Sequence, residues 1–241
     1  MGLGECNPKM GVERAKPQAF LLVGASGGIG GALLKYLLPR TRLVCIPTFN
    51  KNMPTDRSIP WMQFDSLDLD SARQIFEEIT DNYEVSLVID ASGTFFASKL
   101  QKATVEEISQ VISTNLVAPI LLAKNAQKFM VPGGKVVFMS SVVSSMALVG
   151  SSAYAASKAG LERSILSLGP EFSQSGHAVC GIRLGYMNYG MTYKINENTR
   201  KAILEKMPNG GFIDISVLGD LILEIINSEA ANVNGKLYEI T

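Results

Sequence analysis

The sequence is poor in the residues that build metal centres and disulfide frameworks. Its 241 residues include one histidine, His177, and three cysteines that lie far apart, at positions 6, 45 and 180. Zinc sites that need two or three imidazoles are therefore excluded, and an odd, scattered set of cysteines indicates neither a metal knuckle nor a disulfide framework. We expect no bound metal and a reducing, cytoplasmic location. His177 precedes a predicted strand, and we expect it at the surface.

The chain also lacks an excess of charge of either sign and lacks a long apolar run. Its 22 basic and 22 acidic side chains give no net charge, and no dense block of lysine or arginine provides a face for the phosphates of nucleic acid. The apolar runs are far shorter than the roughly 20 residues that span a bilayer, and the N-terminal stretch has no apolar signal-peptide core. We therefore expect no nucleic-acid partner and no membrane partner.

Apolar residues are abundant, at 46% of the chain, and they form short β-branched runs that alternate with amphipathic stretches. This alternation predicts an α/β fold in which helices cover both faces of a parallel sheet. The expected strands are 19–23, 43–46, 85–89, 135–139, 178–183 and 236–240, with a weaker one at 61–64. The expected helices are 28–38, 69–79, 105–129 (two helices meeting near Asn115), 153–172, 198–206 and 215–227. We predict a flexible arm over 1–17 and one domain over 18–241, in which the irregular segment 185–212 is a lid.

A glycine-rich turn follows the first predicted strand and opens the first predicted helix. It reads Val-Gly-Ala-Ser-Gly-Gly-Ile-Gly over residues 23–30. Glycines at positions 24, 28 and 30 permit a tight turn and let backbone N–H groups approach a pyrophosphate at the helix N-terminus. The alternative is an ordinary glycine-rich turn between a strand and a helix.

A tyrosine and a lysine four residues apart, Tyr154 and Lys158, lie on another predicted helix. This spacing places both side chains on one helical face, where the lysine charge should lower the tyrosine pKa from its usual value of about 10. Such a tyrosine suits general acid or base chemistry. The alternative is a solvated helix face.

Two further polar residues keep a consistent order with this pair. Ser141 lies 13 residues before Tyr154, and Asn115 lies 22 residues after Gly93. With the glycine turn, these motifs resemble the short-chain dehydrogenase/reductase family over residues 18–240. The likeness is greatest to 3-oxoacyl-(acyl carrier protein) reductases, through Tyr-Ala-Ala-Ser-Lys-Ala-Gly-Leu at 154–161 and the stretches 200–208 and 228–235. The resemblance implies a single-domain Rossmann fold, with a doubly wound, seven-stranded parallel sheet in the order 3-2-1-4-5-6-7.

The resemblance also implies a catalytic role for each member of the tetrad. Tyr154 would protonate a carbonyl oxygen or deprotonate an alcohol, and Ser141 would hydrogen-bond the same oxygen. Lys158 would bind the nicotinamide ribose and depress the pKa of Tyr154, while Asn115 would hold a water in a proton relay. This chemistry needs neither a metal nor a histidine.

The cofactor implied is NADP(H), with NAD(H) possible, because the second predicted strand does not end in the carboxylate typical of NAD sites. Thr48, Asn50 and Lys51 could receive a 2′-phosphate, although Gly27 occupies a position that is often basic; a plain solvated loop is the alternative. Asp65 would contact adenine or cap the following turn. The expected cofactor-binding residues are Gly24, Ser26, Gly27, Gly28, Ile29, Gly30, Thr48, Asp65, Ser66, Ala91, Ser92, Gly93, Tyr154, Lys158, Gly185 and Met187.

Some positions depart from the family pattern, and the substrate is the least encoded feature. Asp90 replaces a usual asparagine after the fourth strand, so bonding between neighbouring strands must be rearranged there. Aromatic, leucine and methionine residues suggest an apolar pocket; they are Phe95, Phe96, Met146, Leu148, Tyr186, Met187, Tyr189, Met191 and Tyr193. We expect a small carbonyl or alcohol substrate, either free or carrier-linked, and a homodimer or homotetramer built through 115–129 and 154–172. A non-catalytic dinucleotide-binding sensor or scaffold is the alternative, which the intact tetrad disfavours.

Overall fold

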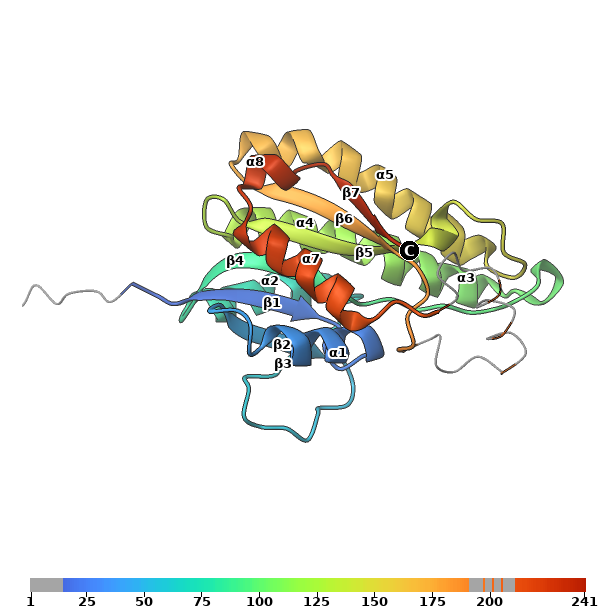
Figure 1. The fold of residues 1–241 in the computed structure, drawn as a ribbon, viewed down its shortest axis with the longest axis horizontal. Helices are drawn as coiled ribbons and strands as arrows, with labels where there is room; N and C mark the ends of the chain where they lie inside the picture. The colour runs from blue at the N-terminus through green and yellow to red at the C-terminus, as the bar shows by residue number, and fades with distance from the viewer. Residues whose placement is uncertain (1–14, 191–196, 198–200, 202–204, 206–210) are drawn as a thin grey trace, which may run out of the picture.

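The computed structural model describes residues 15–190, 197, 201, 205 and 211–241 (Figure 1). Its strands are β1 (Gln18–Val23), β2 (Val44–Phe49), β3 (Met62–Gln63), β4 (Glu84–Asp90), β5 (Lys135–Ser141), β6 (Ala178–Leu184) and β7 (Leu237–Ile240). Its α-helices are α1 (Gly28–Leu37), α2 (Leu69–Thr80), α3 (Val105–Ile112), α4 (Ala118–Phe129), α5 (Ser152–Gln174), α7 (Ile215–Asn227) and α8 (Ala230–Val233). Two 3₁₀ turns, η1 (Leu100–Lys102) and η3 (Val142–Ser144), and a π-turn, η2 (Ser113–Val117), complete it. Most of the predicted helix 198–206, much of the predicted lid and most of the predicted arm lie outside the described residues.

Within the described residues, seven parallel strands form one sheet in the order β3-β2-β1-β4-β5-β6-β7, which confirms the predicted order. The strand order reverses between β1 and β4, which is where open α/β sheets bind ligands beyond the carboxyl ends of their strands. Val23 pairs with Asp90 at that point, and Ser141 pairs with Leu184 farther along the same edge. This edge lies toward the right in Figure 1.

Helices cover both faces of the sheet. Phe76 of α2, Leu122 of α4 and Ile165 of α5 belong to the core on one face. Leu34 of α1 and Ile222 of α7 belong to the core on the other face, in front of the sheet in Figure 1. Because both faces are covered, the strands are apolar runs rather than alternating sequences. Among the helices of the described residues, none is long and apolar enough to cross a membrane.

Strand β2 is longer than predicted, and one short helix was not predicted. The second strand was predicted over 43–46, and the residue that follows, Pro47, has no N–H to donate. The strand continues to Phe49, because Leu22 still pairs with Pro47 and the N–H groups of Ser26 and Phe64 bond the carbonyls of Thr48 and Phe49. Helix α8 was not predicted; it is one short turn of four residues.

The helical stretch 105–129 is divided near Asn115, as expected. Helices α3 and α4 are joined by the π-turn η2, in which Asn115 is buried, at 1% exposure. A π-turn inserts one residue into the helical ladder and is frequent at functional sites. It gives Asn115 an orientation different from that of a residue in a regular helix.

The expectation that His177 lies at the surface is wrong. The side chain is buried, and its Nδ1 lies 3.0 Å from the hydroxyl of Ser175. Gly176, with φ of +73°, turns the chain back beneath the end of α5, where the His177 N–H donates to the carbonyl of Phe172 at 2.9 Å. The burial therefore follows from the tight turn between α5 and β6.

Candidate active site

Tyr154 and Ser141 meet at the carboxyl edge of the sheet. Ser141 is the last residue of β5, and Tyr154 is in the first turn of α5. The Ser141 hydroxyl lies close enough to the Tyr154 phenol to influence its pKa. The ring of Phe95 packs edge-on against Tyr154, with centroids 5.1 Å apart and an angle of 78°. Two hydroxyls therefore share one site, and an aromatic ring covers part of it.

The environment changes the acidity of Tyr154 in the direction opposite to our prediction. Burial raises its pKa, an effect that the Ser141 hydroxyl opposes and the neighbouring Tyr186 reinforces. The Lys158 ammonium lies 5.9 Å from the centre of the Tyr154 ring and donates instead to the carbonyl of Met139 at 2.8 Å. Desolvation of the phenolate therefore outweighs attraction to the lysine. Tyr154 is a protonated phenol at neutral pH.

Lys158 is buried, at 4% exposure, one helical turn after Tyr154. Burial lowers the pKa of Lys158 to about 8, although the carboxylates of Asp90 and Glu162 oppose this shift. A buried cation needs partners. Here the Met139 carbonyl accepts its hydrogen bond and the two acids supply negative charge nearby.

Asn115 fastens the loop after β4 to the helices. Its Oδ1 accepts from the Thr94 N–H at 2.9 Å, while its Nδ2 donates to the Thr94 carbonyl at 2.8 Å and to the Ser157 hydroxyl at 3.2 Å. A Cβ on Gly93 would lie 3.3 Å from Asn115 Oδ1 and 3.8 Å from Lys158 Nζ. The structure thus brings three predicted site residues together: Gly93 from the loop after β4, Asn115 from η2 and Lys158 from α5.

Asp90 lies beneath this cluster at the end of β4. It is 5% exposed, and its Oδ1 accepts the N–H of Ser92 at 2.9 Å. Burial raises the pKa of Asp90, while the hydrogen bond from Ser92 and the charge of Lys158 act in the opposite direction. Its hydrogen bond therefore stays within its own turn instead of crossing to a neighbouring strand.

The glycine turn is packed so closely that side chains would not fit at its key positions. Gly24 has φ of +77°, and a Cβ there would lie 2.8 Å from Ser92 N. A Cβ on Gly30 would lie 2.2 Å from the carbonyl oxygen of Gly24, and one on Gly28 would meet the backbone of Gly190. Gly27 is the N-cap of α1 and, among the described residues, no side chain caps this helix. Its first N–H groups therefore suit an anion.

A cleft of about 240 Å³ lies between this turn and the ends of β1, β2 and β4. Eight predicted cofactor-binding residues line it: Gly24, Ser26, Gly27, Thr48, Ser66, Ala91, Ser92 and Gly93. The Thr48 side chain is buried and its Oγ accepts the Gly24 N–H at 3.2 Å, so it supports the glycine turn, and its contact with a 2′-phosphate stays a prediction. Asn50, also in the lining, and Lys51 are exposed.

The remaining predicted cofactor residues are not in the lining of this cleft. Asp65 caps a turn, since its Oδ1 accepts the Leu67 N–H at 3.0 Å. Met187 is 1% exposed and packs in the core, and the Gly185 N–H donates to the Ile240 carbonyl at 2.8 Å. Ile29 packs against the same core. Any contact of Met187 with a ligand would therefore involve its backbone.

Comparisons with known proteins agree with this geometry. Residues 47–240 match the family model described as enoyl-(acyl carrier protein) reductase. The chain belongs to the short-chain dehydrogenase/reductase family. It is 26% identical over 230 residues to a 3-oxoacyl-[acyl-carrier-protein] reductase, FabG, of Vibrio cholerae serotype O1, and the match covers 91% of this chain and 94% of the relative.

Solved structures of the short-chain family share the fold. A short-chain dehydrogenase from Burkholderia cenocepacia J2315, in complex with NADP, superposes with a TM-score of 0.83 at 21% identity, covering 95% of this chain and 98% of that one. An actinorhodin polyketide ketoreductase variant with NADPH gives 0.83 at 18% identity, covering 93% and 95%. The predicted resemblance and fold class are therefore confirmed.

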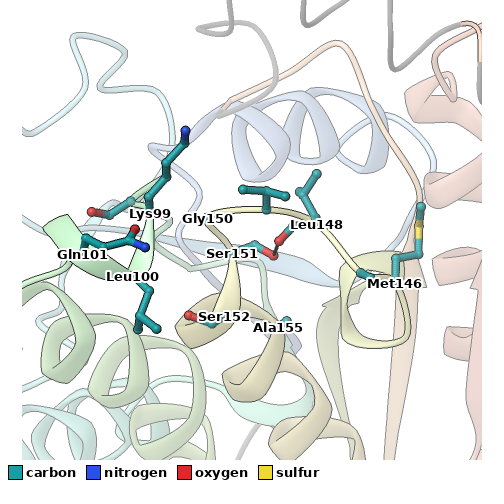
Figure 2. Close-up of a pocket in the computed structure, with 12 residues that line it drawn as sticks. Lys99, Leu100, Gln101, Met146, Leu148, Gly150, Ser151, Ser152 and Ala155 are labelled. Carbon is teal, nitrogen blue, oxygen red and sulfur yellow. Dashed lines mark hydrogen bonds between the residues drawn. The ribbon is translucent and has the colours of Figure 1, made fainter.

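A second cavity, of about 580 Å³, lies beside the start of α5 (Figure 2). Two loops face each other across it, residues 98–101 and 146–152, and the Ser98 N–H donates to the Gly150 carbonyl at 3.1 Å. Met146 and Leu148, both expected near a substrate, are in its lining. Ala155, the neighbour of Tyr154, also lines it, so the cavity reaches the start of α5.

One acid beside Lys158, Glu162, was not predicted from the sequence. Glu162 follows Lys158 by one helical turn and pairs with Arg183 of β6 at 2.7 Å. Two features could have predicted this ion pair. Glu162 directly follows the buried Leu161, and Arg183 lies in a strand whose other residues are buried; charged side chains are rarely buried unless they are paired. Among the described residues, no group of three or more histidine, cysteine or acidic side chains could hold a metal ion.

Proposed function

We propose that the protein is an NADP(H)-dependent oxidoreductase that reduces a ketone or 3-oxoacyl group to an alcohol. The observation that carries the proposal is the juxtaposition of Tyr154 and Ser141, with buried Lys158 one turn away, beside the cleft at the glycine turn. The relative from Vibrio cholerae is named a 3-oxoacyl-[acyl-carrier-protein] reductase, and the two structural neighbours hold NADP and NADPH. These names support both the reaction and the cofactor.

The residues present fit a dinucleotide phosphate. The uncapped first turn of α1 would hold the pyrophosphate, the cleft lined by Ser66 and Ala91 would hold the adenosine, and the exposed Asn50 and Lys51 would receive a 2′-phosphate. When bound, a reduced nicotinamide supplies a hydride for the carbonyl carbon.

Tyr154 is the general acid of the proposed reduction. Its phenol is protonated at neutral pH and donates its proton to the carbonyl oxygen, while the Ser141 hydroxyl donates a hydrogen bond to the same oxygen. The resulting phenolate is stabilised by the Lys158 cation on the same helical face. Asn115 holds the Thr94 loop and Ser157 around the lysine. No step requires a histidine.

A non-catalytic sensor is the competing interpretation, and the comparisons do not favour it. A sensor needs the cleft at the glycine turn and has no need for a tyrosine and a serine placed together beside a buried lysine. Burying Lys158 has an energetic cost, which the Met139 carbonyl and nearby acids offset. That arrangement supports chemistry rather than binding alone.

The proposal includes several features that remain predictions. We propose one catalytic domain over 18–241 with a substrate lid over 185–212, and a carrier-linked substrate by analogy with the curated relative. A homodimer or homotetramer through α4 and α5 is supported by exposed apolar side chains at Val117, Ile120 and Leu166. A cytoplasmic location is supported by the free thiols of Cys45 and Cys180.

The test is a spectrophotometric assay of NADPH oxidation with a panel of ketones and 3-oxoacyl thioesters. We expect Tyr154→Phe to lower kcat by about 100- to 10,000-fold, as for loss of a general acid. Tyr83→Phe is the matched control, because Tyr83 precedes β4 at the opposite edge of the sheet. If NADPH binds and no carbonyl is reduced, the sensor interpretation is correct. If Tyr154→Phe keeps full turnover, the assigned acid is wrong.

A further inference from the structure

The turn that carries Ser141 is held from both ends by one carboxylate. Oε1 of Glu162 accepts hydrogen bonds from the hydroxyls of Ser140, at 2.7 Å, and Ser144, at 2.8 Å. Ser140 precedes Ser141, and Ser144 ends the 3₁₀ turn that follows it. The bonds within the turn are longer, since Ser141 Oγ accepts the Val143 N–H at 3.3 Å. The carboxylate therefore joins the two ends of the turn around the serine.

An arginine holds this carboxylate in place. Arg183 donates from Nε to Oε1 at 3.0 Å and from Nη2 to Oε2 at 2.7 Å, which is the bidentate geometry that fixes a carboxylate most firmly. Ser140 and Arg183 are direct neighbours in the register of β5 and β6. Arg183 also donates to Glu239 of β7 at 2.7 Å, from the solvent side. One network thus connects β5, β6, β7 and α5.

The network is built for an ionised carboxylate. Glu162 is 8% exposed, and burial alone would raise its pKa. The hydrogen bonds from Arg183, Ser140 and Ser144, with the arginine charge, reverse this effect and hold the pKa of Glu162 below its usual value. A buried ion pair contributes little net stability compared with apolar packing. Its benefit here is a fixed geometry next to Ser141.

We infer that Glu162, locked by Arg183, is a positioning residue that fixes the Ser141 turn relative to Tyr154 and Lys158 on the same helix. The inference rests on the proposed function, in which Ser141 must bond the oxygen that Tyr154 protonates. Glu162 is on α5 with the tyrosine and the lysine, at successive four-residue intervals. The helix that carries the general acid Tyr154 therefore also sets the position of Ser141. A displacement of about 1 Å at such a donor can cost about 100-fold in rate.

The test is a double-mutant cycle measured by NADPH oxidation. We expect Glu162→Gln to lower kcat by about 10- to 100-fold with less than about a twofold change in KM for the carbonyl substrate and in Kd for NADPH. Glu239→Gln is the control, because it removes a carboxylate from the same arginine without touching the serines; its kcat should stay within about twofold of wild type. In the Ser141→Ala background, Glu162→Gln should cost less than about a further twofold. Equal losses in both backgrounds would overturn the inference.

A second variant separates positioning from folding. Ser140→Ala combined with Ser144→Ala leaves the Glu162–Arg183 pair intact, so it tests the turn even if Glu162→Gln does not fold. We expect the same loss of kcat, and a crystal structure in which the Ser141 hydroxyl has moved away from that of Tyr154. An unmoved Ser141 would contradict the inference whether or not the wild type reduces a carbonyl. A wild type that reduces no carbonyl refutes the proposed function instead, and the crystal structures still decide the positioning role.

Discussion

Replacing Gly24 by alanine should damage the fold and the cofactor cleft together. Its φ of +77° lies in the left-handed region, and an added Cβ would lie 2.8 Å from the N and 2.9 Å from the Cα of Ser92. Both contacts are with backbone at the end of β4, which cannot yield as a flexible side chain does. Gly133 is the matched control, because its φ is +80° and nothing lies within 4 Å of its added Cβ. Comparing the two alanine variants separates the conformational cost of a positive φ from the cost of steric overlap.

The expected magnitudes follow from this difference. A left-handed alanine costs about 1–2 kcal/mol, and this applies to both variants. Overpacking against fixed atoms adds about 1–3 kcal/mol, and this applies to Gly24→Ala alone. At about 2–4 °C per kcal/mol for a chain of this size, Tm should fall by about 2–8 °C for Gly133→Ala and by about 4–20 °C for Gly24→Ala.

Thermal and urea unfolding followed by circular dichroism measure the stability change, and fluorescence titration with NADPH measures binding. Relief of the overlap must shift Ser92, whose N–H bonds Asp90 at 2.9 Å. We therefore expect Gly24→Ala to weaken NADPH binding at least about tenfold at temperatures where it is folded, and Gly133→Ala to bind as wild type does. Equal Tm losses for both variants would refute the steric argument. Normal NADPH binding by Gly24→Ala would refute the placement of the cofactor.

Three further outcomes follow from the site. Because the pKa of Lys158 is about 8 and the cation stabilises the developing phenolate, kcat/KM for reduction should be constant below that pH and fall as pH rises through it, measured as a pH–rate profile. Asp90→Asn removes a negative charge that raises the pKa of Lys158, so the falling limb of the profile should move to lower pH. A limb that does not move would show that it does not report the titration of Lys158. Lys51→Ala should raise KM for NADPH about tenfold and leave KM for NADH unchanged. Thr48→Val removes the acceptor of the Gly24 N–H, so it should raise KM for NADPH and for NADH equally.

The sheet could be predicted from the sequence because its signals are local. Each buried strand is a short apolar run, and the glycine turn marks where the first strand meets its helix. The extent of β2 could not be predicted in this way. The proline at its centre removes one donor, but whether a strand survives that loss depends on the neighbouring strand, and Leu22 of β1 pairs with Pro47. The resemblance of the motifs, rather than the pattern of strands, supplied the order of the sheet.

The site was predictable as a set of residue types and not as an electrostatic environment. The spacing of Tyr154 and Lys158 shows that one charge lies near one phenol, and attraction between them lowers a tyrosine pKa. Spacing contains no information about desolvation, which depends on how the loop with Phe95 and the end of β5 enclose the ring. The sign of the pKa shift was therefore wrong although the residues were placed together.

Glu162 was missed for a related reason, and its position explains why the protonated phenol is useful. Glu162 contacts both Ser140 and Arg183 only because β5 and β6 place those two residues side by side, although they are 43 positions apart in the chain. Because Arg183 pairs with the carboxylate, Glu162 opposes the developing phenolate less than an unpaired carboxylate would, and burial keeps the phenol protonated until a carbonyl oxygen takes the proton. An unpaired Glu162 would instead hold Lys158 more firmly in its cationic form and repel the developing phenolate. Glu162 thus fixes the turn that carries Ser141, and its pairing with Arg183 reduces the effect of its negative charge on Tyr154.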